Sequence, residues 1–248
     1  MAEQPKLKKR RQRKPQLPSQ QQVLGQLAQR PTVALLQSSA VWLLAEPPLQ
    51  QLLDHACIGT VEEALASGEP ACNTASGNEQ ATQQLTAIRL SLLEAFFWAY
   101  ALESLEVWEV DNGRPAVRLS HEELWIRCNQ LQADFAMSYA AYQHFRSKGW
   151  IPRSGLQYGA HFVLYQKHPS VAHSDYCVVL LPLKNPAVLG LSWNDLEVTN
   201  RLSNQVGKRL LLLFMHEREC SRPDSLERLA CFSVQEHVVR RWVPDENR

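Results

Sequence analysis

The stretch WIPRSGLQYGAHFVLYQKHPSVAHSDYCVVLLP, residues 150–182, decides the fold of the second half of the chain. Three runs within it, WIP, HFVLY and DYCVVLLP, are rich in the β-branched and aromatic residues typical of strands. Pro169 ends the second run, because proline cannot donate a hydrogen bond to a sheet ladder. Residues 158–173 therefore hold a strand that ends at Tyr165 and a loop that reaches His173. Two side chains able to transfer protons are expected near each other there.

Further elements lie on both sides of this stretch. RLLLLFMH and CFSVQEHVV read as two more strands, and residues 194–207 before them read as a helix. Upstream, residues 119–150 predict one long helix. Ser120 and Glu123 fit a capping box at its start, and Gly149 fits its end. The second half of the chain is therefore predicted to be an α/β unit with a mixed sheet.

The first half predicts a smaller α/β unit. Residues 32–61 hold an apolar, strand-like stretch followed by a short helix after two prolines. Residues 66–84 are rich in small, turn-forming residues and predict a flexible, exposed loop. Residues 85–105 predict a buried helix, and LEVWEV after them a short strand followed by a turn at Asp111–Gly113. We therefore expect a disordered basic tail, 1–29, an N-terminal α/β domain, 30–135, and a C-terminal catalytic domain, 136–248.

Charge is distributed unevenly along the chain, although the net charge is only +1. Residues 6–14, KLKKRRQRK, carry seven of the 26 basic side chains. Residues 15–135 have five Arg against 14 acids, and residues 136–248 have 14 basic against 10 acidic side chains. A polyanion is therefore expected to meet the tail and the C-terminal part, and to be repelled by the middle. The tail itself is read as a nuclear localisation signal, an RNA-contacting arm or a solubilising segment.

Composition excludes several classes of protein. No apolar run reaches the roughly 18 residues of a membrane-spanning helix, and the basic N-terminus lacks the apolar core of a signal peptide. The six cysteines are scattered without a C-x-x-C pair, so free thiols in a reducing compartment are expected, and no zinc site. No cofactor is expected. Phosphate-loop, dinucleotide-binding and serine-hydrolase motifs are absent.

One set of residues combines proton-transfer groups with a cation. Tyr165 closes a strand, His173 follows eight residues later, and Lys208 stands before the strand RLLLLFMH. Singly, each has a structural reading: a strand tyrosine, a solvated loop histidine, and a lysine at a helix C-terminus.

The stretch FRSKGWIPRSGLQYGAHFVLYQKHPSVAHSDYCVVLL, followed by NRLSNQVGKRLLLLF, closely resembles the tRNA splicing endonuclease family over about residues 145–242. It is most similar to the catalytic subunit that cuts pre-tRNA at the 5′ splice site. The resemblance implies a catalytic triad of Tyr165, His173 and Lys208, and a structural role for Tyr158. His161 departs from the family, in which relatives often have an acid, and this puts local packing in doubt.

The resemblance implies RNA cleavage by the neighbouring 2′-hydroxyl without a metal, leaving a 2′,3′-cyclic phosphate and a 5′-hydroxyl. Such a reaction needs a base, an acid and positive charge beside the phosphorus. Histidine, with a reference pKa of about 6.5, suits proton donation at neutral pH. Tyrosine is a poor base unless a cation stabilises its phenolate, which Lys208 can do. The family implies Tyr165 as base and His173 as acid.

Two more residues match a family position that clamps a base at the splice site, Arg201 and Trp242. Their structural readings are a surface helix residue and a core anchor. The resemblance also implies a pre-tRNA substrate and partner subunits of a hetero-oligomeric complex. A nuclear location is expected from the basic tail. The alternatives are a non-catalytic subunit of that complex, the subunit for the 3′ site, and an unrelated RNA-binding module. A non-catalytic subunit would lack a triad residue, and the modest basic balance disfavours the RNA-binding module.

Overall fold

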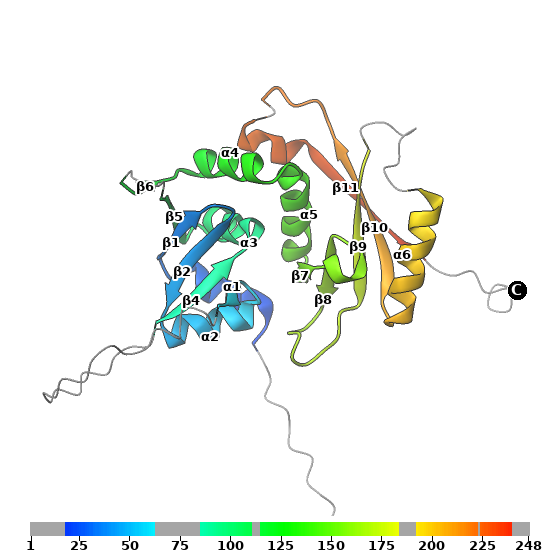
Figure 1. Cartoon of the computed structure of the whole chain (residues 1–248), viewed down its shortest axis with the longest axis horizontal. Helices are drawn as coiled ribbons and strands as arrows, with labels where there is room; N and C mark the ends of the chain where they lie inside the picture. The colour runs from blue at the N-terminus through cyan, green and yellow to red at the C-terminus, as the bar shows by residue number, and fades with distance from the viewer. Residues whose placement is uncertain (1–17, 63–84, 111–114, 184–191, 223, 240–248) are drawn as a thin grey trace, which may run out of the picture.

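Two mixed sheets lie side by side with helix α5 (Phe135–Ser147) between them (Figure 1). The computed structural model describes residues 18–62, 85–110, 115–183, 192–222 and 224–239. The predicted loop at 66–84 and the turn at 111–113 lie outside these residues. Both units are α/β, as the sequence predicts.

The N-terminal sheet has six strands. In spatial order they are β3 (Thr60–Val61), β4 (Thr86–Leu90), β2 (Ala40–Ala45), β1 (Thr32–Gln37), β5 (Leu105–Glu109) and β6 (Val117–Arg118). Among the described strands of this sheet, only the pair β1 and β5 is parallel. The stretch predicted as one strand is a hairpin of β1 and β2, with Ser38 in the left-handed region at φ 56°. The prediction missed this turn because it contains no Gly or Asn.

The helices of this unit correct two predictions. Gln20–Ala28 form helix α1, so the expected tail of residues 1–29 is wrong for this part; Ser19 caps the helix, and Val23 and Leu27 are buried. The predicted helix 85–105 is also wrong in its first part, because Thr86–Leu90 pair with β2 as strand β4. Helix α3 (Leu92–Phe96) then starts at a capping box formed by Ser91 and Glu94 and continues as a π-helical turn, Phe97–Ala101.

The predicted long helix over residues 119–150 is two helices, α4 (His121–Leu131) and α5. Its start is confirmed, since the Ser120 and Glu123 capping box is present, and Gly149 ends it with φ 81°. The break comes at Gln132, which is extended. In a straight helix Trp125 and Phe135 would stand about 15 Å apart along the axis. The break brings their rings to 5.6 Å, so aromatic packing decides against the straight helix.

The C-terminal sheet has five strands. Their order is β11 (Phe232–Val239), β10 (Arg209–Glu217), β9 (Tyr176–Pro182), β8 (Phe162–Tyr165) and β7 (Ile151–Ser154). Strands β9 and β10 are parallel and the other pairs antiparallel, so the predicted mixed sheet is confirmed. Helix α6 (Trp193–Gln205) lies between β9 and β10 in the chain and packs on the face opposite α5 (Figure 1).

One contiguous cluster of buried side chains runs from the inner face of the N-terminal sheet to the α5 face of the C-terminal sheet. The rings of Phe96, Trp125, Phe135 and Tyr139 form its centre, with centroids 4.7 to 6.4 Å apart. A second, smaller cluster lies between the C-terminal sheet and α6. The five described cysteines are free thiols.

None of the helices that the structure describes has the length and apolar character needed to cross a bilayer.

Candidate active site

Three chain segments meet at one end of the C-terminal sheet. Strand β8 ends there at Tyr165, β9 begins there at Tyr176, and β10 begins there at Arg209. The register pairs Leu164 with Tyr176, and Tyr176 with Arg209. Residues 165, 175 and 208 therefore stand side by side, one step beyond these pairs.

Backbone hydrogen bonds continue the ladder at this step. The Asp175 N–H donates to the Leu164 carbonyl at 2.8 Å, and the Asp175 carbonyl accepts from Arg209 N–H at 3.0 Å. Asp175 thus lies between Tyr165 and Lys208 in the backbone, although it belongs to no strand. The sequence predicts Asp175 as the first residue of the strand DYCVVLLP, but its place between Tyr165 and Lys208 follows only from the strand register.

Residues 165, 175 and 208 form a row at the end of the sheet. The alternation of side chains along strands puts this row on the α6 face. Val163, Cys177 and Leu210 are paired in register and belong to the cluster under α6. Tyr165 and Lys208 lie two residues from Val163 and Leu210 respectively, so they share that face. Tyr165 packs against the same cluster. The structure therefore brings two of the three predicted triad residues to one face at one end of the sheet.

Lys208 is a buried cation, only 8% exposed. Its ammonium lies 4.8 Å from the ring centroid of Tyr158, within the range of a cation–π interaction, and 3.5 Å from the Val206 carbonyl. Among the described residues, no carboxylate forms an ion pair with it. Burial raises the pKa of the nearby Cys177 thiol, and the Ser203 hydroxyl and the Lys208 ammonium oppose that rise. A buried lysine without a carboxylate partner is well suited to meet a phosphate.

His173 approaches this row from the loop between β8 and β9. It is exposed and stands two residues before Asp175, so its backbone lies within about 7 Å of that residue. An exposed imidazole next to a row with a phenol and an ammonium supplies the groups that acid–base chemistry on a phosphate needs.

The position of Tyr158 is fixed by the turn that precedes β8. A 3₁₀ turn, Leu156–Tyr158, starts after Gly155. A Cβ on Gly155 would lie 2.8 to 2.9 Å from main-chain atoms of Ala160 and Phe162, so only glycine lets the turn pack this closely. The turn thus places the ring of Tyr158 against the Lys208 ammonium, which agrees with the structural role that the resemblance implies.

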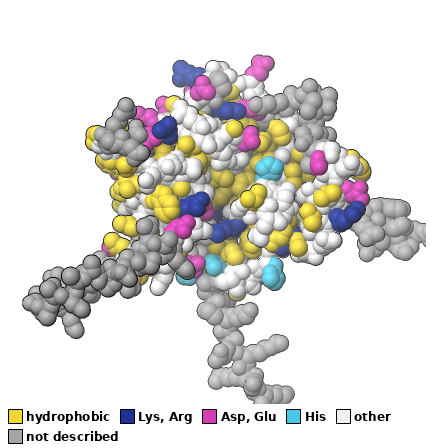
Figure 2. Space-filling view, in the orientation of Figure 1, with side chains coloured by type: hydrophobic (Ala, Val, Ile, Leu, Met, Phe, Trp, Pro, Cys, Tyr) yellow, Lys and Arg dark blue, Asp and Glu magenta, His cyan; other side chains and the backbone are white. Residues whose placement is uncertain are grey.

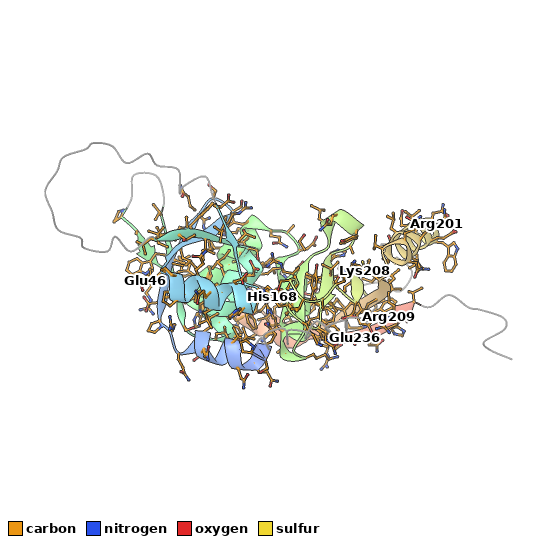
Figure 3. All side chains as sticks on the ribbon, turned by 90° about the horizontal axis from the view of Figure 1, so that it is seen from below. Glu46, His168, Arg201, Lys208, Arg209 and Glu236 are labelled. Carbon is orange, nitrogen blue, oxygen red and sulfur yellow. The ribbon has the colours of Figure 1, made fainter. Side chains whose placement is uncertain are left out.

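The remaining predicted residues lie elsewhere. His161 accepts a hydrogen bond at Nδ1 from the Leu180 N–H, at 3.2 Å. Arg201 is on α6, apart from Lys208 in Figure 3, and pairs with Glu197 at 2.9 Å. The buried side of α6 contains Thr199 and Ser203, so Arg201 points away from the sheet. Trp242 lies outside the described residues. The base clamp therefore stays a prediction.

The mixed sheet and the row at its end lie in a domain of a known class. Residues 135–222 match the tRNA intron endonuclease catalytic C-terminal domain. These residues begin at the first residue of α5 and contain Tyr165, His173 and Lys208.

Relatives that match most of the chain narrow the class further. The tRNA-splicing endonuclease subunit Sen2-1 of Arabidopsis thaliana is 35% identical over 224 residues, which cover 90% of this chain and 85% of the relative. Sen2-2 of the same plant is 33% identical over 90% of this chain and 80% of its own. The mouse subunit Sen2 is 34% identical over 65% of this chain and 35% of its own. The chain belongs to the tRNA-splicing endonuclease family, as a subunit of the Sen2 type, and is an endoribonuclease of the tRNA-intron lyase class.

Proposed function

We propose that this subunit cleaves pre-tRNA at the 5′ splice site by attack of the neighbouring 2′-hydroxyl, with Tyr165, His173 and Lys208 as its catalytic residues. The observation that carries the proposal is the row at the end of the C-terminal sheet. It sets a phenol and a buried ammonium on one face, with an exposed imidazole on the segment leading into it. The preference for the 5′ site rests on the resemblance of residues 153–165, RSGLQYGAHFVLY.

Each residue has one task in this reaction. Tyr165 takes the proton of the 2′-hydroxyl, whose oxygen then forms a bond to phosphorus. The bond from phosphorus to the 5′ oxygen breaks, and His173 donates a proton to that oxygen. Lys208 favours the phenolate and the charge that gathers on the phosphate. The products are a 2′,3′-cyclic phosphate and a 5′-hydroxyl, and no metal is required.

The test is cleavage of an intron-containing pre-tRNA by the complex reconstituted with its partner subunits. His173→Ala should lower the rate at the 5′ site by about 10²–10⁴-fold, because proton transfer typically contributes that much. Assembly and cutting at the 3′ site should persist. Undiminished 5′ cleavage, loss of the 3′ cut instead, or loss of activity in EDTA would contradict the proposal.

We propose that the chain acts with other subunits of a hetero-oligomeric complex. The open face of the N-terminal sheet and the outer side of α6 expose large apolar residues, among them Leu44, Trp193 and Leu202. The acidic balance of residues 15–135 suits a basic protein partner better than RNA. A purified chain that is monomeric, soluble and fully active alone would show that no partner is needed.

For substrate grip we propose Arg201 and Trp242 as a clamp on an unpaired base. Stacking of a base on an aromatic ring contributes about 1–3 kcal/mol. Trp242→Ala should slow cleavage roughly ten- to hundred-fold with little change in pre-tRNA affinity, and Trp242→Phe should largely restore the rate. Equal losses in both variants, with a lower melting temperature, would identify Trp242 as a core anchor.

A nuclear location is proposed from the basic segment KLKKRRQRK, residues 6–14. The full chain fused to a fluorescent protein should accumulate in nuclei, and replacing the seven basic residues with Gln should abolish this. Unchanged nuclear accumulation in that variant would assign the segment another task.

A further inference from the structure

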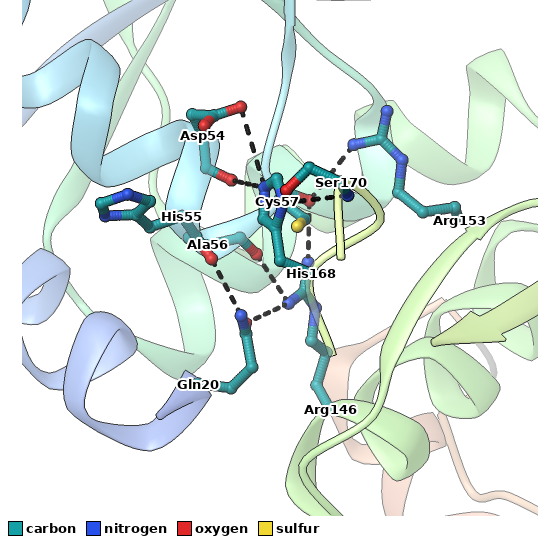
Figure 4. A network of polar contacts seen from close by, with 9 residues as sticks. All are labelled: Gln20, Asp54, His55, Ala56, Cys57, Arg146, Arg153, His168 and Ser170. Atoms are coloured by element: carbon teal, nitrogen blue, oxygen red, sulfur yellow. Dashed lines mark hydrogen bonds and ion pairs between the residues drawn. The ribbon is translucent and has the colours of Figure 1, made fainter. Parts of the chain in front are cut away.

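The C-terminal end of helix α2 (Pro47–Ala56) is held by side chains from far along the chain (Figure 4). Helices end with carbonyls that lack partners within the helix. Here four consecutive carbonyls, of residues 54–57, accept hydrogen bonds from side chains. The donors are His168 to Asp54 at 3.0 Å, Gln20 to His55 at 2.8 Å, Arg146 to Ala56 at 3.0 Å and to Cys57 at 3.1 Å, and Arg153 to Cys57 at 3.4 Å.

These donors differ in where they come from. Arg146 stands on helix α5 and Arg153 on strand β7, so both belong to the framework of the molecule. His168 is the exception, because it belongs to the loop between β8 and β9. That loop is the one that carries His173, and in Figure 3 His168 lies near the middle of the molecule, between the two units. Dark-blue cationic side chains are visible near the middle of the face in Figure 2, where the units meet.

The tautomer of His168 follows from its neighbours. Its Nδ1 lies 3.2 Å from the backbone N–H of Ser170, which can only donate, so Nδ1 must accept. The Ser170 hydroxyl lies 2.7 Å from the same nitrogen. Its Nε2 then carries the hydrogen that is donated to the Asp54 carbonyl. The ring is held at both nitrogens, and its side chain is only 14% exposed.

The backbone of the loop is folded around the same residue. The His168 carbonyl accepts from the N–H groups of Val171, at 2.9 Å, and Ala172, at 3.2 Å. Ala172 directly precedes His173. On the other side, only two residues separate His168 from Tyr165. The hydrogen bond from His168 to α2 is thus linked by a short, hydrogen-bonded piece of chain to the predicted acid.

We propose that His168 is a positioning residue for cleavage: it fastens the loop that carries His173 to the C-terminal end of α2, and so lets the N-terminal unit set the place of the acid. This inference rests on the proposed function in that it takes His173 as the acid. A displacement of a catalytic group by about 1 Å can lower a rate roughly 10²-fold.

The test uses the reconstituted complex, an intron-containing pre-tRNA and two matched replacements. The amide nitrogen of Gln reaches the place of the imidazole Nε2, so His168→Gln keeps the bond to the Asp54 carbonyl. The amide of Asn reaches only the place of Nδ1, so His168→Asn keeps the contact to Ser170 alone. We expect His168→Ala and His168→Asn to lower kcat about 10- to 100-fold with KM little changed, and His168→Gln to restore most of it.

Asp54→Asn is the matched control. It keeps the backbone carbonyl that His168 binds and removes a carboxylate that is 3.8 Å from Nε2 and 71% exposed. We expect its rate to be unchanged. A loss as large as that of His168→Ala would show that the carboxylate is the true partner, which would overturn the inference.

His173→Ala, measured in parallel, separates the two proposals. If it is fully active, the proposed function fails. If it is inactive while His168→Ala keeps full activity, only the positioning role fails. If Gln and Asn rescue the rate equally, the bond to the Asp54 carbonyl is not what matters. If the rate falls only in proportion to a lower melting temperature or poorer assembly, His168 is a structural residue. Either outcome would overturn the positioning role.

Discussion

The two sheets of this molecule differ in how many of their faces are covered. The C-terminal sheet is packed by α5 on one face and α6 on the other, so the middle of β9 is buried at five consecutive residues, Cys177–Leu181. The described elements cover the N-terminal sheet on one face only. Along β1 buried and exposed residues alternate, and Val33, Leu35 and Leu44 are 44 to 64% exposed on its open side. The enclosed sheet carries the candidate site, whereas the open one presents a surface.

This difference shows which sheet can hold side chains in a fixed geometry. Close packing on both faces leaves a strand little freedom to shift, so the row that ends in Lys208 inherits a fixed geometry. The open face of the other sheet includes a hollow lined by Val33, Leu35, Trp42 and Leu44. Exposed apolar residues there should stabilise the fold much less than buried apolar residues of the enclosed sheet. Four substitutions test that contrast.

Leu213→Ala in the enclosed sheet should have the largest effect. Leu213 is completely buried in β10, so its truncation leaves a cavity, and the free energy of unfolding should fall by about 2–5 kcal/mol. Urea denaturation of the full chain, followed by circular dichroism, measures the change. A loss below about 1 kcal/mol would show that the enclosed sheet relaxes around the cavity.

Arg146→Leu should come next, because it removes two hydrogen bonds between α5 and the C-terminal end of α2. Arg146 is 4% exposed, and its guanidinium donates to Tyr142 Oη at 3.0 Å as well as to the carbonyls of Ala56 and Cys57. Removing it takes away the donor of the Ala56 carbonyl and leaves the Cys57 carbonyl with Arg153 alone. The free energy of unfolding should therefore fall by about 2–3 kcal/mol. Arg146→Lys should recover part of this, since an ammonium can still donate to one carbonyl. If Leu and Lys lose equally, packing and not hydrogen bonding is what Arg146 contributes.

Glu236→Gln, on edge strand β11, should have a small effect that depends on pH. Burial alone would raise the pKa of the Glu236 carboxyl, but hydrogen bonds from Lys148 and His144, both at 2.7 Å, outweigh it and hold the pKa below its usual range. Because the folded pKa is lower than the unfolded pKa of about 4.3, the ionised carboxylate stabilises the fold at a pH above about 4.3. This stabilisation is lost as the pH falls through the folded pKa. A third of the side chain is exposed, so solvent screens the pairs and we expect less than about 1 kcal/mol.

The measurement is the free energy of unfolding of the wild-type and Glu236→Gln chains between pH 7 and pH 3. The two curves should run parallel above about pH 5 and converge in acid. A difference that grows in acid would contradict the sign of the pKa shift.

Leu44→Ala should have the smallest effect and is the matched partner of Leu213→Ala. Leu44 is 64% exposed on the open face, so the free energy of unfolding should change by no more than about 0.5 kcal/mol. The same assay applies. A loss above 1 kcal/mol would mean that something in the chain covers this face in solution.

The sequence predicted the enclosed sheet better than the open one, for a physical reason. Continuous apolar runs such as DYCVVLLP, bounded by turn residues, leave little doubt about a strand. In the N-terminal unit, the turn at Ser38 carries no glycine, and β4 runs directly into a helix cap at Ser91, so periodicity alone merged neighbouring elements. The break at Gln132 also escaped notice, because aromatic contacts in three dimensions cause it.

Part of the candidate site could be predicted from the sequence, and part follows only from the fold. Tyr165, His173 and Lys208 came from resemblance to a family, since each has an ordinary structural reading by itself. The ring of Tyr158 facing the Lys208 ammonium, the place of Asp175 and the bond from His168 to α2 depend on which strands are neighbours. Spacing along the chain carries no signal for them.

The close approach at Gly155 bears on how the sequence can change over generations. A Cβ there would meet main-chain atoms of Ala160 and Phe162, and a main-chain clash is relieved only by moving the chain itself. Replacing a neighbouring side chain by a smaller one creates no room. A genetic search for suppressors of Gly155→Ala should therefore yield insertions, deletions or altered pairing around the turn and β8, and few simple exchanges of one side chain for another.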